Sequence, residues 1–135
     1  MTKPEPKSGQ KPKPLIRASE AGGRSIDDPS DEAVHDLLAD MNLSWPFVIV
    51  ERLDREPVDE HYMQVHLNGD LSYQVEYREG SADRHFQAHV PSQGDVIGPQ
   101  PVARVISDWA HDRGGWREAL PWTPWSPHGK PYKDA

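Results

Sequence analysis

Residues 61–78 read HYMQVHLNGDLSYQVEYR, and apolar and polar side chains alternate along both halves of this segment. Successive side chains of a β-strand point to opposite faces of a sheet, so the alternation predicts two strands that each bury one face. Asn68 and Gly69 lie between the two halves and favour a hairpin, because both residue types tolerate a positive φ. The predicted inward side chains are Met63, Val65 and Leu67 in the first strand and Tyr73, Val75 and Tyr77 in the second.

Two further segments continue this pattern on either side of the hairpin. Residues 45–53 contain the longest apolar run of the chain and are predicted to form a strand, with Trp45 in the core. Residues 85–90 alternate in the same way and follow a turn around Gly80. Four consecutive strands joined by turns predict an antiparallel meander with one apolar and one polar face.

The apolar period changes from two to about 3.6 residues at both ends of this meander. The first helix is predicted from a cap at Asp28-Pro29-Ser30 to Asn42, and the second from Pro101 to Gly114-Gly115. The second helix has an apolar stripe made of Val102, Val105, Ile106, Trp109 and Ala110. We therefore expect an α+β fold of two layers, in which an N-terminal and a C-terminal helix cover one face of a four-stranded antiparallel meander.

Composition divides the chain into a body and two polar ends. Residues 1–25 are rich in proline and lysine, and six basic against two acidic side chains give them a charge of +4. We predict that they form a disordered basic tail, because they hold too few apolar side chains to offset the entropy of ordering. Residues 26–126 are predicted to form a single α+β domain, and residues 127–135 a disordered C-terminus.

The charge of the body limits the classes of partner. Residues 25–135 carry nine basic and 20 acidic side chains, which repel the phosphates of nucleic acid, so we expect a basic protein partner and no direct nucleic-acid binding. The alternative is that the charge only keeps the protein in solution. The chain has no cysteine, no apolar run behind its first charges and no membrane-spanning apolar run, so we expect a cytoplasmic location without membrane contact.

The residues predict neither a catalytic centre nor a cofactor. The sequence lacks a phosphate-binding glycine loop, a Gly-x-Ser-x-Gly elbow and a His-Glu-x-x-His motif. His66, His85 and His89 could gather on the polar sheet face, where a metal would need three nitrogens about 2 Å from one point. Solvated strand histidines are the simpler interpretation, and a flat sheet face rarely forms a catalytic cleft. We therefore predict a protein that is not an enzyme and holds no metal or cofactor.

The polar sheet face is instead a candidate surface for a protein partner. It carries tyrosine and arginine, which often anchor interfaces, although an ordinary solvated sheet face is the alternative. Three tryptophans near the C-terminus, Trp116, Trp122 and Trp125, would add anchors if they are exposed, whereas packing in the core or against a sheet edge is the alternative for them. The predicted partner-binding residues are Tyr62, His66, Glu76, Arg78, Asp83, His85, Trp116 and Trp125.

Residues 73–86, YQVEYREGSADRHF, resemble a block found in small uncharacterised actinobacterial proteins. The resemblance extends over about residues 45–125, and its other matching segments are Glu51-Arg52-Leu53-Asp54, Trp109-Ala110, Gly115-Trp116-Arg117-Glu118 and Trp122. The layout is also similar to a family of immunity proteins from bacterial polymorphic toxin systems, which is associated with deaminase-type toxins. Members of that family end a C-terminal segment in Leu-x-Trp, which Leu120-Pro121-Trp122 matches here.

This resemblance implies an inhibitor that binds a basic, nucleic-acid-acting toxin stoichiometrically and covers its substrate groove. The acidic body suits such a partner, because a groove built for phosphates is basic. The implied anchors are Tyr62, Arg78, Trp116 and Trp125, with Glu76 and Asp83 as charge partners. A regulatory or scaffold module of actinobacterial or phage origin, with another protein partner, is the second interpretation. An enzyme that uses the histidine-rich face is the third.

Overall fold

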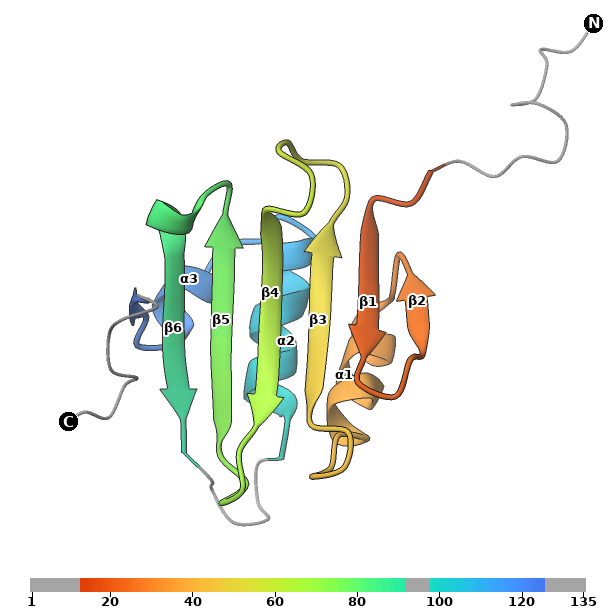
Figure 1. The fold of residues 1–135 in the computed structure, drawn as a ribbon, viewed down its shortest axis with the longest axis vertical. Helices are drawn as coiled ribbons and strands as arrows, with labels where there is room; N and C mark the ends of the chain where they lie inside the picture. Colours follow the sequence, from red (N-terminus) through yellow and green to blue (C-terminus); the bar gives the residue numbers. More distant parts are fainter. Residues whose placement is uncertain (1–12, 92–97, 126–135) are drawn as a thin grey trace, which may run out of the picture.

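The computed structural model describes residues 13–91 and 98–125, which build a sheet of seven antiparallel strands (Figure 1). The strand order across the sheet is β2-β1-β3-β4-β5-β6-β7. The strands are β1 (Ile16–Glu20), β2 (Ser25–Asp27), β3 (Phe47–Arg52), β4 (His61–Leu67), β5 (Tyr73–Glu79), β6 (His85–Val90) and β7 (Thr123–Pro124).

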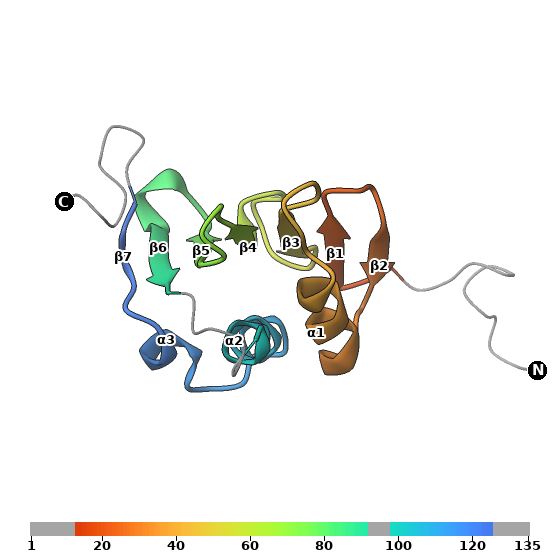
Figure 2. The same cartoon turned by 90° about the horizontal axis from the view of Figure 1, so that it is seen from below.

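The α-helices of the described residues all lie on one side of the sheet, and no described helix covers the other side (Figure 2). They are α1 (Asp31–Ala39), α2 (Gln100–Ala110) and α3 (Trp116–Ala119), and a 3-10 turn, η1 (Ala82–Arg84), precedes β6. The fold is therefore α+β, as predicted. None of these helices is long and apolar enough to cross a membrane.

The core fills the space between the helices and the inner face of the sheet. Met63, Val65 and Val75 of the predicted hairpin are completely buried there, as their alternation predicts. Leu38 of α1 and Ile106 of α2 close the core from the helix side. Burial of each such side chain contributes about 1.5–3 kcal/mol, so the core holds the helices to one face.

The sheet has seven strands, not the four predicted. The four predicted strands correspond to β3–β6, and β1 and β2 extend the sheet beyond β3 while β7 extends it beyond β6. The prediction of a disordered tail is wrong for residues 16–25, because β1 pairs with β3 along its whole length and buries Ile16 and Ala18. Residues 1–12 and the predicted C-terminal tail, 127–135, lie outside the described residues.

The element boundaries also differ from the predictions. The predicted cap of α1 is present, because the Ser30 hydroxyl accepts a hydrogen bond from the Ala33 N–H. Both helices end earlier than expected, α1 at Ala39 and α2 at Ala110. Trp45 was predicted in the core, but β3 begins two residues later and 56% of Trp45 is exposed. The predicted hairpin between β4 and β5 is confirmed, yet its positive φ of 70° falls at Leu71 and not at Asn68 or Gly69.

A buried arginine ties β3 to the end of α2. Arg52 lies on the inner side of the sheet and its side chain is only 6% exposed. Its guanidinium donates to Asp54 at 2.9 Å, to Asp112 at 3.0 Å and to the carbonyl of Trp109 at 3.4 Å. Burying a charged guanidinium without hydrogen-bond acceptors costs free energy, so these three acceptors permit the burial of Arg52.

Replacing Arg52 with methionine is expected to lower the free energy of unfolding by about 2–3 kcal/mol. The charge-assisted hydrogen bonds are lost, while the two carboxylates that remain keep part of their solvent. Chemical denaturation followed by tryptophan fluorescence measures the change. Arg104→Met is the matched control, because the Arg104 side chain is 84% exposed, and its effect should stay below about 0.5 kcal/mol. Equal losses in the two variants would contradict the proposed role of Arg52.

The same contacts predict a pH dependence of stability. Hydrogen bonds from Arg52 hold the pKa of Asp54 and of Asp112 below the usual range. The contribution of these two ionised carboxylates to the free energy of unfolding is therefore complete above their unfolded-state pKa of about 3.9. It is lost as the pH falls through their lower folded-state pKa values. We expect the Tm of the native chain to fall between about pH 5 and about pH 3. The Arg52→Met chain should show a shallower fall in buffers of equal ionic strength, and parallel curves would argue against this linkage.

Candidate functional site

The side of the sheet that faces away from the helices, called here the open face, is the candidate site. The strand registers place one row of its side chains side by side, because Glu51 pairs with Tyr62, Tyr62 with Arg78, and Arg78 with His85. The rest of the face follows from the same alternation. Its side chains are Arg17, Ser19, Phe47, Ile49, Glu51, Tyr62, Gln64, His66, Gln74, Glu76, Arg78, His85, Gln87 and His89.

A chain of charged and polar contacts crosses this face from β4 to β6. Glu60, just before β4, accepts a hydrogen bond from Arg78 Nε at 2.6 Å. Arg78 Nη1 lies 3.5 Å from Nδ1 of His85, and Nε2 of the same imidazole lies 2.9 Å from a carboxylate oxygen of Glu76. A guanidinium only donates and a carboxylate accepts, so the contacts assign the proton of neutral His85 to Nε2.

Two aromatic rings enclose His85. The indole of Trp125 lies over the imidazole with ring centroids 4.6 Å apart and planes at 35°. The backbone N–H of Trp125 donates to the His85 carbonyl at 2.9 Å. Tyr62 meets the ring edge-on at 6.0 Å, and burial raises the pKa of the Tyr62 hydroxyl. His85 is consequently 5% exposed, although it belongs to the open face.

The structure brings most of the predicted partner-binding residues together. Tyr62, Glu76, Arg78, His85 and Trp125 form one cluster through the contacts described above. His66 lies on the same face of β4, four residues after Tyr62. Asp83 belongs to η1, in the connection between β5 and β6 at the end of the sheet.

Trp116 is the predicted residue that the structure places elsewhere. It belongs to α3 on the helix side, is 7% exposed and packs edge-on against Tyr77 with ring centroids 4.9 Å apart. The guanidinium of Arg117 lies 4.4 Å from its ring centroid. The alternative that the sequence left open, packing in the core, therefore describes Trp116, and it is not available as an anchor for a partner.

Sequence reasoning missed three members of this region. Phe47 and Ile49 are half-buried apolar side chains on the open face of β3, and Glu60 holds Arg78 in place. The continuous apolar run of β3 was the available signal, because a strand that lacks alternation has apolar side chains on both faces. Nothing in the spacing of the sequence singled out Glu60, which precedes its strand.

The Glu76–His85 pair has the residue types of a general acid and base, but its geometry suits a structural contact. Both ring nitrogens of His85 are engaged and its ring is covered by Trp125. Proton transfer needs a base within hydrogen-bond reach of a substrate, and the side chain of His85 is only 4% exposed. Among residues 13–91 and 98–125, no group of three or more His, Asp or Glu side chains is placed to hold a metal ion.

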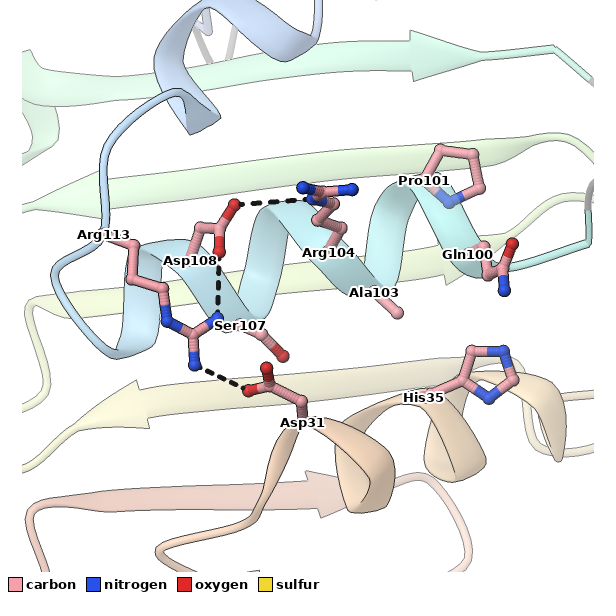
Figure 3. A pocket seen from close by; sticks show the side chains of 9 residues that line it. All are labelled: Asp31, His35, Gln100, Pro101, Ala103, Arg104, Ser107, Asp108 and Arg113. Atoms are coloured by element: carbon pink, nitrogen blue, oxygen red, sulfur yellow. Dashed lines mark hydrogen bonds and ion pairs between the residues drawn. The ribbon is translucent and has the colours of Figure 1, made fainter.

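A groove of about 670 Å³ lies on the opposite side of the molecule, between α1 and α2 (Figure 3). Arg113 joins the two helices there, because its guanidinium contacts Asp31 and Asp108 at 3.0 Å each. The hydrogen bond from Arg113 lowers the pKa of Asp31, and the buried Ser107 hydroxyl points toward the same carboxylate. No hydrogen bond joins Ser107 to a histidine in the described part of the chain, so its hydroxyl lacks the Ser–His contact that commonly activates a nucleophile.

Comparison with known proteins adds no relative. No family model matches the chain, and no curated protein and no solved structure matches it either. The resemblance to immunity proteins of deaminase-type toxins therefore stays a prediction. The geometry of the open face and the charge of the chain are the observations from which a function can be argued.

The arrangement around His85 predicts a single tautomer. At about pH 8, where an imidazole is neutral, ¹⁵N shifts of labelled histidine should show a protonated Nε2 and an unprotonated Nδ1 for His85. His35, whose side chain is 39% exposed, serves as the comparison and should show both tautomers. A protonated Nδ1 at His85 would contradict the contact with Arg78.

Proposed function

We propose that this chain is a non-catalytic protein-binding module, an immunity- or antitoxin-like inhibitor that masks a basic, nucleic-acid-acting toxin with its open face. The observation that carries the proposal is a seven-stranded sheet whose α-helices, among residues 13–91 and 98–125, all lie on one side. The other side presents an extended sheet face whose side chains contact one another across the strands. Such a surface suits another macromolecule better than a small substrate, which needs a concave site.

The side chains of the open face are held in fixed positions by one another, which supports binding through this face. Arg78 is held by Glu60, and Tyr62 and Trp125 are held against His85 by ring packing and a backbone hydrogen bond. Side chains that are fixed before binding lose less entropy in a complex, which favours affinity. Tyrosine, tryptophan and arginine are also the residue types that most often carry interface energy.

The charge of the open face supports a basic partner. The strands of the face carry Glu51 and Glu76 against Arg17 and Arg78. Asp27 of β2, which pairs with Arg17, and Glu60 before β4, which contacts Arg78, adjoin this face and bring its acidic side chains to an excess. A groove that binds nucleic acid is rich in Lys and Arg, so the two surfaces would attract each other and associate faster at low salt. Phe47 and Ile49 add apolar contact area in the middle of the sheet.

The first test is capture of a partner with tagged full-length chain from host lysate, followed by affinity measurement with the purified partner. We expect one stoichiometric basic partner, with an association rate that falls as salt rises. Gln64→Arg should weaken binding at least about tenfold, because it adds a cation at the centre of the open face. The cross-strand neighbour Glu76 can pair with this cation, so the variant should remain folded.

Gln100→Arg is the matched control, because Gln100 lies at the start of α2 on the helix side. Binding that is equally weakened by both variants, or by neither, would reject the open face as the interface. Capture of an acidic partner would also contradict the proposal of a toxin inhibitor. A basic partner without nucleic-acid chemistry would instead favour a regulatory or scaffold module, and bound metal with no protein partner would favour an enzyme.

A further inference from the structure

The loop between α1 and β3 presents an apolar side chain to solvent in a fixed position. Trp45 is 56% exposed and Leu43 is 58% exposed. Asn42 fixes the loop, because its side-chain oxygen accepts hydrogen bonds from the N–H groups of Ser44 at 2.8 Å and Trp45 at 3.0 Å. The backbones of Asn42 and Trp45 also exchange two hydrogen bonds. An exposed tryptophan on such a loop is ordered before any partner arrives.

A pocket of about 400 Å³ lies beside this tryptophan. Its apolar lining comes from Leu37, Met41 and Trp45, and the turn between β1 and β2 forms another wall. The Trp45 ring lies so close to Gly22 that a Cβ added to this glycine would be 3.3 Å from ring atom Cδ2. The polar residues of the pocket are Glu20, Arg24, Asp40 and Asn42.

The pocket has more negative than positive charge. Arg24 is its cation, and it is shared between Glu20 at 3.3 Å and Asp40 at 3.2 Å. The Asp40 side chain remains 63% exposed. Asp40 also caps the C-terminus of α1, where the helix dipole is negative, and the last turn contains no basic residue. This end of the helix therefore favours one further cation.

We propose that this pocket binds a lysine or arginine side chain of a protein partner. The aliphatic stem of that side chain would lie on Leu37, Met41 and Trp45, while its cationic head would meet Asp40. A cation beside an indole gains a further electrostatic attraction from the ring face. The amphipathic shape of a basic side chain matches the pocket, because its stem is apolar and its head is charged.

Other occupants fit less well. A purely apolar side chain would remove water from Asp40 without replacing its hydrogen bonds, which costs free energy. An anion would be repelled by both carboxylates and by the helix dipole. The pocket lies at the helix side of the sheet, with walls from α1 and from the β1–β2 turn, so this inference does not rest on the proposed role of the open face.

The experiment is an NMR titration of the full-length chain with the peptide acetyl-Leu-Arg-Leu-amide. The readout is the indole N–H signal of Trp45, identified by its loss in Trp45→Phe. We expect saturable shifts with a Kd in the millimolar range, as befits a single side-chain contact. The peptide acetyl-Leu-Glu-Leu-amide should produce no saturable shift up to about 10 mM, because it carries the opposite charge.

Asp40→Asn should weaken binding of the arginine peptide by about twofold to fivefold, as expected for an exposed ion pair. Asp59→Asn is the matched control and should not weaken it, because Asp59 lies in the β3–β4 loop at a positive φ that asparagine also adopts. Circular dichroism of both variants checks that they are folded. Equal shifts with both peptides, or no Trp45 shift with either, would overturn the proposal. Trp45 shifts that depend on chain concentration alone would assign the pocket to a second copy of the chain and overturn it as well.

Discussion

A sheet covered by helices on one side only must present two chemically different faces, and the alternation along β4 and β5 satisfies this constraint. Met63, Val65 and Val75 enter the core, while Gln64 and Glu76 lie opposite. A shift of one residue in the pairing would exchange every side chain between the faces and bury carboxylates without partners. The hydrophobic core and the open face are therefore fixed by the same register, and neither can change without the other.

Arg52 is the exception to this alternation. It occupies an inward position of β3 where an apolar side chain would be expected. The exception is possible because α2 ends beside it, and the last carbonyls of a helix have no partners within the helix. Arg52 donates to one of these, the carbonyl of Trp109, and to Asp112 just beyond it. The negative end of the α2 dipole adds to this attraction, so charge complements hydrophobic packing in positioning α2 on the sheet.

The local pattern of apolar residues was sufficient to predict the centre of the fold but not the elements near its two ends. The hairpin and the buried stripe of α2 follow from side-chain period alone, and both are present. β1 was missed because Ile16–Glu20 has too few apolar residues to predict order. Its order comes from pairing with β3, whose paired residues lie 28 to 36 positions further along the chain, from Glu20 with Val48 to Ile16 with Arg52. Trp116 was misplaced for the same reason, since its packing against Tyr77 depends on where α3 meets the sheet. The strand members of the open-face cluster, Tyr62, Glu76, Arg78 and His85, could be predicted because the alternation along each strand places them on one face.

The edges of the sheet restrict how this protein can bind. An exposed edge strand offers unpaired backbone groups to any other strand, and native sheets often prevent such pairing with short edge strands. Here the described edges are β2 with three residues and β7 with two. Addition of a partner strand would gain few backbone hydrogen bonds at either edge. The proposed recognition would therefore rest on side chains, such as those held in place on the open face and around Trp45. Both regions have acidic groups beside aromatic rings. The two proposals therefore agree on one class of partner, a basic protein surface with side chains that pack on aromatic rings.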